Sequence, residues 1–296
     1  MSATIIDGKQ IASNFYNELK EKISRLDSDE IPVLAVVSVG DNPASKIYVK
    51  TKQKKAQEIG IGCEVIELSS SIGENALLEI IDELNDNRHI NGIIVQLPLP
   101  KHLDQLKILS RIHPSKDVDG FTPYNTGLLS YNDKNGFISA TPKGILHLLK
   151  STNIDLTGKH AVVIGRSNIV GKPMGMLLLN QDCSVTITHS KSQNIKDIVK
   201  TADILVVACG QPKMIKSSWI KKGAIIIDVG INRTEDALCG DVDFEDVKNQ
   251  ASFITPVPGG VGPMTVAMLL DNTYQAFCLQ KDNLSCNCHH KNCHCH

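Results

Sequence analysis

The sequence lacks an excess of charge of either sign, because its 296 residues include 31 basic and 32 acidic side chains. No block of like charge resembles a nucleic-acid-binding arm, so we expect no nucleic-acid partner. No uninterrupted apolar segment approaches the roughly 20 residues that cross a bilayer, and no apolar stretch follows a basic start at the N-terminus. We therefore expect neither a membrane partner nor a secretory signal, and a soluble, cytoplasmic protein.

Cysteine is scarce in most of the chain and concentrated at its end. Scattered cysteines in apolar stretches are typical of small core side chains in a reducing compartment; here they are Cys63, Cys183, Cys209, Cys239 and Cys278. The last eleven residues hold eight candidate metal ligands: Cys286, Cys288, His289, His290, Cys293, His294, Cys295 and His296. Their C-x-C and adjacent-histidine spacing suits zinc, copper(I) or nickel in a flexible wrap. The alternative is a dispensable extension.

Short runs rich in valine and isoleucine alternate with helix-like stretches. Continuous apolar strands that alternate with helices are typical of parallel sheets covered on both faces. The expected strands are residues 33–39, 63–68, 92–97, 160–165, 184–189, 204–209, 224–230 and 252–257. The expected helices are residues 43–59, 73–88, 172–181, 194–200, 243–249 and 263–280.

The strands form two sets, separated by a turn-rich stretch at residues 116–135. This arrangement predicts an α/β protein with two domains flanking a cleft. We expect an N-terminal α/β catalytic domain at residues 1–140 plus 264–285, since the last helix is expected to cross back to it. The second domain, at residues 141–263, is expected to be a Rossmann-type parallel-sheet nucleotide domain. Residues 286–296 are the separate Cys/His tail.

A glycine-rich turn follows the strand expected at residues 160–165. In VVIGRSNIVGKPMG the glycines are Gly165, Gly171 and Gly175, and Ser167 stands where a dinucleotide fingerprint has its second glycine. A buried strand before the turn and a helix after it are the context that dinucleotide binding requires. A plain turn between strand and helix is the alternative.

The next strand indicates which nucleotide this turn binds. NAD-binding domains place a carboxylate about 20 residues further on, where it binds the ribose hydroxyls. Here the strand ends in His189, Ser190 and Lys191, and Arg166 lies in the turn itself. These side chains suit a phosphate, which a carboxylate would repel. We therefore expect NADP rather than NAD.

In the first domain, Tyr48 and Lys52 are four residues apart and share one face of an expected helix. An exposed surface pair is the ordinary explanation of such spacing. Short-chain dehydrogenases also use Y-x-x-x-K, but they place it downstream of a glycine turn in the same domain. Here the pair precedes the glycine turn by more than a hundred residues, so that interpretation fails.

Three further motifs follow strands, where α/β sheets bind ligands. GIIVQLPLP carries Gln96 in an apolar strand, and a buried amide needs a hydrogen-bond partner. KDVDGFTP offers Asp117 and Asp119, which are turn residues in the simplest interpretation. TPVPGGVGPMT, residues 255–265, has three prolines and three glycines. We expect it to form a rigid loop that cradles a polar ligand.

Together, Y-V-x-x-K, VQLPLP, KDVDGF, G-R-S-x-x-V-G-x-P and PGGVGPMT closely resemble the motifs of the bifunctional methylenetetrahydrofolate dehydrogenase/methenyltetrahydrofolate cyclohydrolase family of the FolD type. The motifs run in order from Tyr48 to Thr265, and the resemblance covers the chain to about Leu284. It implies NADP-dependent oxidation of 5,10-methylenetetrahydrofolate to 5,10-methenyltetrahydrofolate, followed by hydrolysis to 10-formyltetrahydrofolate. It also implies a homodimer with a place in one-carbon metabolism and purine biosynthesis.

By motif match, the resemblance implies that Lys52 is the catalytic base or acid, Gln96 its orienting partner, Tyr48 a ring-packing residue and Asp119 the pterin anchor. The implied folate-binding residues are Tyr48, Lys52, Val95, Gln96, Leu97, Asp119, Pro258, Gly259, Gly260, Val261, Gly262 and Thr265. The implied NADP-binding residues are Gly165, Arg166, Ser167, Ser190 and Ile231. Two alternatives remain: a dehydrogenase without the hydrolytic activity, and a metal-binding protein on a retained enzyme scaffold.

Overall fold

The computed structural model describes residues 2–27, 30–233 and 238–290, without the side chains of Ala44 and of residues 283–290. Two compact units make up the chain. Unit 1 comprises Met1–Phe15, Leu128–Lys134 and Ile138–Met268, and unit 2 comprises Tyr16–Gly127, Asn135–Phe137 and Leu269–His296. Two helices, α1 (Gly8–Ile23) and α10 (Val261–His290), begin in unit 1 and continue into unit 2.

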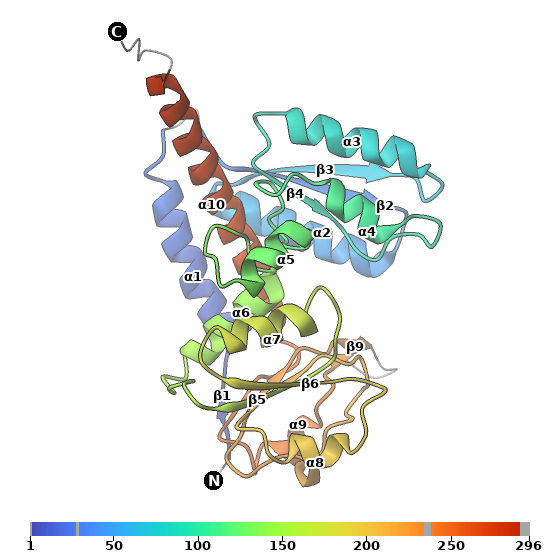
Figure 1. The fold of residues 1–296 in the computed structure, drawn as a ribbon, viewed down its shortest axis with the longest axis vertical. Coiled ribbons are helices and arrows are strands. Elements are labelled where there is room, and N and C mark those ends of the chain that lie inside the picture. Colours follow the sequence, from blue (N-terminus) through green and yellow to red (C-terminus); the bar gives the residue numbers. More distant parts are fainter. Residues whose placement is uncertain (1, 28–29, 234–237, 291–296) are drawn as a thin grey trace. The chain divides into compact units, whose positions relative to one another are not determined.

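The described part of unit 2 is built on a parallel sheet in the order β3-β2-β4. Its strands are β2 (Val33–Val39), β3 (Gly62–Leu68) and β4 (Gly92–Val95). β2 is the central strand and is apolar along nearly all its length, as a strand covered on both faces requires. Figure 1 shows α2 (Pro43–Ile59) and α3 (Glu74–Asp86) on opposite faces of this sheet.

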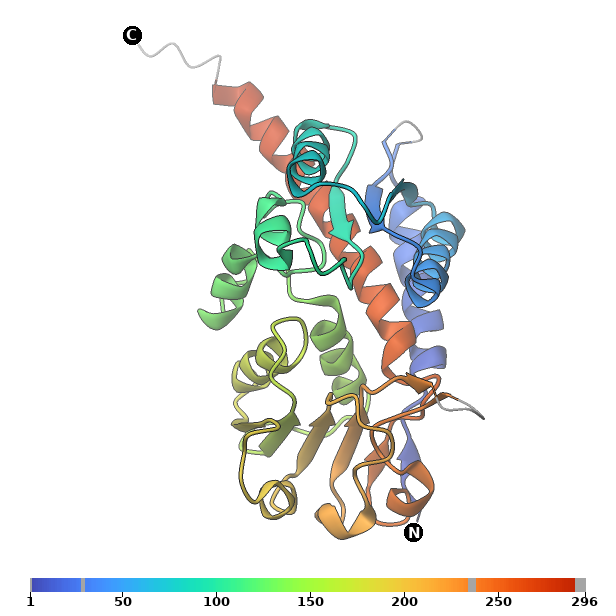
Figure 2. The same ribbon diagram turned by 90° about the vertical axis from the view of Figure 1, so that its right-hand side faces the viewer.

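Further elements complete unit 2 around β4. Helix α4 (Gln105–Arg111) packs with α3, and its Ile108 and Leu109 belong to the core beneath the sheet. The later part of α10 lies beside β4 in Figure 2, and a Cβ on Gly92 would come within 3.4 Å of Thr273 Oγ1. On the other edge of β4, the backbone of residues 116–117 pairs with Ile93.

In unit 1, the described strands form a six-stranded parallel sheet in the order β1-β11-β8-β7-β5-β6. The strands are β1 (Thr4–Ile5), β5 (His160–Ile164), β6 (Ser184–Thr188), β7 (Ile204–Val207), β8 (Ile225–Asp228) and β11 (Phe253–Ile254). One face is covered by α7 (Gly171–Leu179), and the other by α8 (Ile195–Val199) and α9 (Phe244–Val247) (Figure 1). The remaining elements are α6 (Ala140–Lys150), the 3-10 helix η1 (Ser217–Trp219), β9 (Asn232–Arg233) and β10 (Leu238–Cys239).

The structure confirms the predicted fold class, an α/β protein with a Rossmann-type parallel sheet and a second α/β unit. The expected strand at residues 33–39 and helix at 43–59 have the observed bounds of β2 and α2. In most other strands the observed end lies one to three residues before the expected one. Among the described residues, no helix is long and apolar enough to cross a membrane.

Three sequence predictions of local structure were incomplete or wrong. The stretch 116–135 is not turns throughout, since α5 (Pro123–Ser130) begins at a proline, which is favoured in the first helical turn. The strand expected at residues 252–257 is only the two residues of β11. Helices α1, α4 and α6 were not predicted, although their buried residues follow helical spacing.

Candidate active site

A buried lysine and an amide meet in unit 2. Lys52 lies in the middle of α2, and Gln96 follows directly after β4. The Nζ of Lys52 donates a hydrogen bond of 3.0 Å to Oε1 of Gln96, and Nε2 of Gln96 donates to the carbonyl of Leu97 at 2.9 Å. The backbone N–H of Gln96 donates to Val37, which continues the β2–β4 ladder past the end of β4. The amide is therefore fixed at both ends.

The environment of Lys52 favours its neutral form. Its side chain is only 9% exposed, and burial lowers the pKa of its amine, with a partial opposing effect from the nearby carboxylate of Asp119. In the described part of the chain, Gln96 is the only hydrogen-bond partner of Lys52. An ammonium has three N–H donors, so a buried one with a single acceptor is unfavourable. A neutral amine at this place is suited to accept a proton.

Two acidic residues of the KDVDG motif have different surroundings. Asp117 is 1% exposed and accepts hydrogen bonds from the backbone N–H groups of Phe121 and Thr122 and from Nδ2 of Asn125. Asp119, in contrast, has no hydrogen-bond partner among the described residues. Burial is the main cause that raises the pKa of Asp119 to about 6, while Lys52 opposes this effect. Asp117 thus shapes the turn, and Asp119 is left with an open carboxyl group.

Lys116, the first residue of that motif, has a structural task that the sequence did not reveal. Its Nζ donates to three backbone carbonyls at the end of α3, those of Leu84, Asn85 and Asn87, at 3.0, 2.7 and 2.7 Å. These carbonyls lack helical partners, so the ammonium caps the helix. Lys116 and Asp117 together hold the segment that carries Asp119.

Three other predicted folate-binding residues belong to the same unit. Tyr48 lies one turn before Lys52 on α2 and is 39% exposed. The side chain of Val95 is 1% exposed and packs in the core, so only its backbone is available to a ligand. Leu97 accepts the bond that orients Gln96. Cys63 on β3, which was not predicted, interacts electrostatically with Lys52, and burial raises the pKa of its thiol to about 11.

The glycine turn of unit 1 requires each of its glycines. Gly165 has a φ of +121°, and a Cβ there would lie 2.2 Å from the carbonyl oxygen of Ala208. A Cβ on Gly171 would lie 2.1 Å from the carbonyl oxygen of Gly165. On Gly175 it would lie 2.6 Å from Cδ1 of Ile187 on β6. The three positions permit a tight turn, a close backbone approach and close helix–sheet packing, as in dinucleotide-binding turns.

Ser167 explains the spacing of this turn. Its Oγ accepts hydrogen bonds from the backbone N–H groups of Val170 and Gly171 at 3.1 and 3.3 Å, so the serine caps the start of α7. Arg166 beside it is exposed and has no ion-pair partner in the part of the chain that the structure describes. Ser190 is also exposed, in the turn that follows β6. These residues fit a phosphate-bearing nucleotide.

Two buried aspartates of unit 1 hold neighbouring loops, and sequence reasoning missed both. Asp228 is 3% exposed, and burial raises its pKa to about 6 although three backbone N–H groups favour its charged form. Asp241 is fully buried and also accepts three hydrogen bonds. The donors to Asp228 are Gly230, Asp241 and Val242, and the donors to Asp241 are Cys209, Gly210 and Asn232. They fix both sides of Ile231, a predicted cofactor-binding residue that is 50% exposed.

The proline- and glycine-rich stretch is only partly a loop, which corrects the sequence prediction. Residues 255–260 are irregular, but Val261, Gly262 and Thr265 belong to the first turns of α10. Pro263 is compatible with this because a proline in the first turn of a helix removes no internal hydrogen bond. Other predicted residues, Pro258, Gly259 and Gly260, precede the helix. A Cβ on Gly260 would lie 2.6 Å from the carbonyl oxygen of Pro256, so this loop is tightly folded.

Within unit 1, the start of α10 approaches one predicted cofactor-binding residue, Ile231. A Cβ on Gly262 would lie 3.9 Å from Cδ1 of Ile231. Thr265 Oγ1 lies 3.1 Å from Thr141 Oγ1, which places the hydroxyl one turn into α10.

The predicted metal ligands of the tail lie outside the described residues. This applies to the side chains of Cys286, Cys288, His289 and His290 and to all of Cys293, His294, Cys295 and His296.

The fold and the two sets of residues define a two-unit α/β enzyme that binds a nucleotide. Comparison with known families specifies which one. Residues 6–119 match the model of the tetrahydrofolate dehydrogenase/cyclohydrolase catalytic domain, and residues 139–281 match that of the NAD(P)-binding domain of the same family. The chain belongs to the tetrahydrofolate dehydrogenase/cyclohydrolase family, which confirms the resemblance seen in its motifs. The tail beyond residue 281 lies outside both matches.

Relatives agree over most of the chain. A bifunctional protein FolD of Bacillus cytotoxicus is 54% identical over 278 residues, which are 93% of this chain and 97% of that protein. The crystal structure of a FolD from Campylobacter jejuni superposes with a TM-score of 0.93 at 47% identity, covering 94% of this chain and all of that one. A FolD of Trypanosoma brucei, complexed with NADP cofactor and inhibitor, has a TM-score of 0.91 at 38% identity and covers 94% and 98%.

Proposed function

We propose that the chain oxidises 5,10-methylenetetrahydrofolate with NADP and hydrolyses the resulting 5,10-methenyltetrahydrofolate to 10-formyltetrahydrofolate. The observation that carries this proposal is the buried Lys52. Its Nζ lies 3.0 Å from Oε1 of Gln96, and burial lowers the pKa of its amine. Hydrolysis near neutral pH needs such a base. The relatives named bifunctional and the relative complexed with NADP support the two activities and the cofactor. We also retain the domain boundaries 1–140 plus 264–285 and 141–263 as part of this proposal.

Folate is held, in this proposal, by the open carboxyl group of Asp119. Ionised, its two oxygens accept two hydrogen bonds from the amino-pyrimidine edge of the pterin in a fork geometry. Tyr48, one turn from Lys52, packs against the ring system. Pro258, Gly259, Gly260 and the start of α10 stay in this proposal as predicted folate-binding residues.

For the oxidation, the chain mainly orients its reactants. The two nitrogens that flank the methylene carbon promote loss of the hydride, and NADP, when bound, accepts it. Gly165 and Gly171 allow the backbone to approach the pyrophosphate closely. Arg166 and Ser190 pair with the 2′-phosphate, which distinguishes NADP from NAD.

For the hydrolysis, Lys52 moves the protons. The methenyl product is a cation, and a neighbouring positive charge lowers the pKa of the lysine further. The neutral amine takes a proton from water as the water oxygen bonds to the methenyl carbon. The resulting ammonium then returns a proton to the ring nitrogen whose bond to that carbon breaks, while the hydroxyl of the adduct releases its proton to water and becomes the formyl oxygen. Gln96 Oε1 holds the amine in place through both steps.

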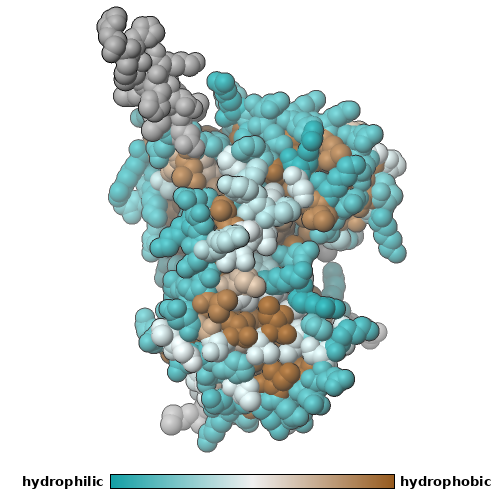
Figure 3. Space-filling view, viewed as in Figure 1, coloured by the Kyte–Doolittle hydropathy of each residue, from teal (hydrophilic) through white to brown (hydrophobic). Residues whose placement is uncertain are grey.

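The oligomeric state and the cellular setting form a separate part of the proposal. We propose a homodimer in the cytoplasm that serves one-carbon metabolism and purine biosynthesis. Hydrophobic side chains gather around α7 and the edge strand β6 on the face shown in Figure 3, and Leu179 there is 54% exposed. Large exposed apolar patches are typical of protein interfaces, which supports the dimer.

A metal ion on the Cys/His tail is a further proposal, supported by its eight candidate ligands alone. Soft thiolates and imidazoles at such spacing suit zinc, copper(I) or nickel. We assign this ion no part in the two reactions, because the groups proposed for them lie elsewhere in the chain.

One assay tests the proposed function against both alternatives. NADPH and the methenyl species absorb at different wavelengths, so both are followed while the enzyme turns over methylenetetrahydrofolate. We expect NADPH to rise without lasting accumulation of the methenyl species. If the methenyl species accumulated in step with NADPH and disappeared only at the non-enzymatic rate, the protein would be a dehydrogenase without hydrolytic activity. Absence of NADPH formation would favour the metal-binding protein.

A further inference from the structure

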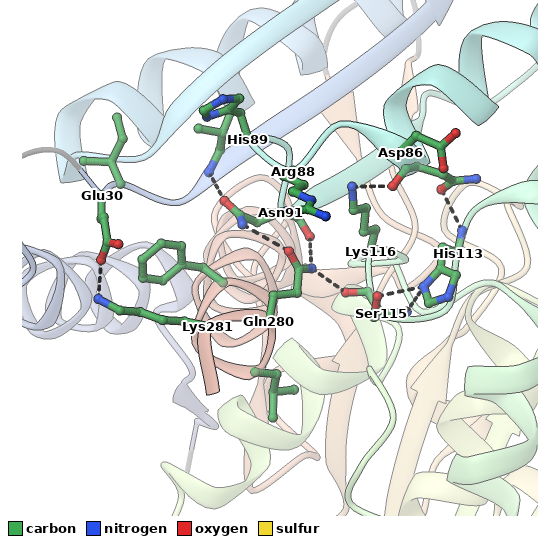
Figure 4. A pocket seen from close by; sticks show the side chains of 15 residues that line it. Glu30, Asp86, Arg88, His89, Asn91, His113, Ser115, Lys116, Gln280 and Lys281 are labelled. Carbon is green, nitrogen blue, oxygen red and sulfur yellow. Dashed lines mark hydrogen bonds and ion pairs between the residues drawn. The ribbon is translucent and has the colours of Figure 1, made fainter. Parts of the chain in front are cut away.

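A cavity of about 710 Å³ lies in unit 2, at the opposite end of the sheet from Lys52 and Gln96. Its lining includes Asn91 just before β4 (Figure 4) and Val33 at the start of β2. Gln96 follows the other end of β4. The remaining walls come from the end of α3, residues 113–116 and α10. This volume is within the roughly 300–1,000 Å³ of small-molecule sites.

Apolar side chains form one side of the cavity. Ile31 and Leu279 are 47% and 48% exposed, and Phe277 beside them is 8% exposed. Ile31 precedes β2 and the other two belong to α10, so the surface joins two elements that are far apart in sequence. Such a surface stabilises a ligand by removing its apolar body from water.

The polar walls of the cavity are satisfied internally. Lys116 donates three hydrogen bonds to the carbonyls at the end of α3. Asn91 donates to Oε1 of Gln280 at 3.1 Å, and Nε2 of Gln280 donates to the carbonyls of Asn91 and Ser115 at 2.9 and 3.0 Å (Figure 4). This network ties α10 to β4 and to the segment before Lys116. The cavity is therefore preformed, so a ligand need not order it.

Nitrogen donors at the cavity remain available. The guanidinium of Arg88 and the ring of His89 have no side-chain partner in the described ranges, and His113 uses only Nδ1, with Ser115. Among the other charges, Glu30 pairs with Lys281, and Asp86 interacts with Lys116. With neutral histidines the lining carries three cations and two carboxylates. The uncommitted charge is thus that of Arg88.

We propose that this cavity is a second ligand site, which binds a small organic anion with an apolar body. The anionic group pairs with Arg88, with His89 and His113 as further donors. The apolar body covers Ile31, Phe277 and Leu279. No residue assigned above to folate, NADP or proton transfer lines the cavity, so the site is independent of the proposed function.

The probe for this site is 1-anilinonaphthalene-8-sulfonate, an aromatic anion whose fluorescence rises in apolar surroundings. The full chain is titrated in saturating NADP, so that the nucleotide site is filled. Arg88→Gln removes the charge, and Leu279→Gln removes the apolar contact at a half-exposed position. Arg25→Gln is the matched control, because Arg25 is an exposed arginine of unit 2 that pairs with Glu21 outside the cavity.

We expect saturable binding that Arg88→Gln weakens about 10-fold or more, the effect of losing one charge-assisted hydrogen bond. Leu279→Gln should weaken it several-fold, and Arg25→Gln should leave it unchanged. Equal thermal midpoints in the three variants would show that folding is intact. The proposal is overturned if the probe does not bind at about 1 mM, if Arg88→Gln and Leu279→Gln both bind it as the parent does, or if Arg25→Gln weakens binding equally.

Discussion

The Nζ of Lys52 lies 3.0 Å from Oε1 of Gln96, and the other end of that amide donates to the carbonyl of Leu97. The bond to Leu97 fixes the orientation of the amide. An inverted amide would present its N–H donors to Lys52 and would lose its bond to Leu97. Gln96 thus offers Lys52 an acceptor that carries no charge. A carboxylate at the same place would hold the lysine equally well, but it would keep the lysine protonated.

Replacement of Lys52 by methionine should separate the two activities. Lys52→Met keeps the apolar stem and removes the amine, so cyclohydrolase activity should fall by about 10²–10⁴-fold, the effect of a positioned base. Dehydrogenase activity should remain measurable, and the methenyl species should accumulate. The matched control is Lys54→Met on the same helix, at a side chain that is 77% exposed. Hydrolysis at the parent rate by Lys52→Met, or loss of both activities in a folded variant, would contradict the assignment.

The charge on residue 96 should set the pH at which hydrolysis begins. Gln96→Glu keeps the size of the side chain and places a carboxylate against Lys52, so the pKa of the amine rises. The rising limb of cyclohydrolase rate against pH should therefore move to higher pH. Gln96→Ala should instead lower the rate, since the lysine loses its orienting partner. An unshifted limb in a folded Gln96→Glu variant would show that Lys52 is not the titrating base.

The two aspartates of the KDVDG motif should respond differently to the same substitution. Asp119→Asn removes the open carboxylate and should raise KM for folate substantially. Asp117→Asn puts an NH₂ group among three N–H donors and should lower the free energy of unfolding by about 1–3 kcal/mol. Substrate titrations and urea denaturation measure the two effects. Reversed results would exchange the roles of the two residues.

Asp119 should also affect stability through pH. Its pKa is raised to about 6 in the folded chain, so its contribution to stability is greatest below its ordinary value near 3.8 and is lost as pH rises through 6. Asp119→Asn should therefore be more stable than the parent at pH 8, with a smaller difference at pH 5. Urea denaturation of the ligand-free chain at both values measures this. An equal difference at pH 5 and pH 8 would contradict the raised pKa.

Arg166 should determine the preference for NADP. Arg166→Ala should weaken NADP binding by about 10- to 150-fold, because a charge-assisted hydrogen bond contributes roughly 1.5–3 kcal/mol. NAD, which lacks the 2′-phosphate, serves as the control ligand and should lose little affinity. Equal losses for both cofactors, measured by fluorescence titration, would place Arg166 away from the phosphate.

Deletion of residues 286–296 should abolish metal uptake and leave both enzymatic activities near the parent level. The physical reason is that the tail holds all eight candidate ligands, while the proposed reacting groups are in the body of the chain. Metal content is measured after dialysis against zinc, copper(I) or nickel, and turnover in metal-free buffer. A fall in turnover on deletion would make the tail part of the catalytic machinery.

Much of the fold could be predicted because parallel sheets leave a clear pattern. The run at residues 33–39 is buried along nearly its whole length, so its composition alone marks a central strand. Helix α1 was not predicted, although its buried residues Ala12, Leu19 and Ile23 follow helical spacing. The end of a strand is also hard to predict, since residues such as Gln96 continue the backbone ladder while their side chains already belong to the site.

For the candidate site, the residues could be predicted from the sequence, but the interactions of each side chain could not. Asp117 and Asp119 are equivalent in sequence, and only the positions of Phe121, Thr122 and Asn125 show which one is already hydrogen-bonded. Ser167 stays a predicted cofactor-binding residue, and the sequence did not reveal that its hydroxyl also caps α7. Asp228 and Asp241 carry no sequence signal beyond a carboxylate at the end of an apolar strand and another after a glycine.

The short segment from Lys116 to Asp119 fixes the position of the Asp119 carboxylate in the catalytic unit. Lys116 is attached to α3 and Asp117 to the following turn, so Asp119 is only two residues from a firmly held point. An inserted residue between Asp117 and Asp119 would therefore displace the carboxylate by up to one Cα–Cα step of about 3.8 Å while leaving both attachments intact. Insertions in the exposed stretch around Tyr131, which is 87% exposed, would be absorbed without reaching it. Length variation should thus be tolerated in the exposed stretch around Tyr131, which belongs to unit 1, and excluded between Asp117 and Asp119.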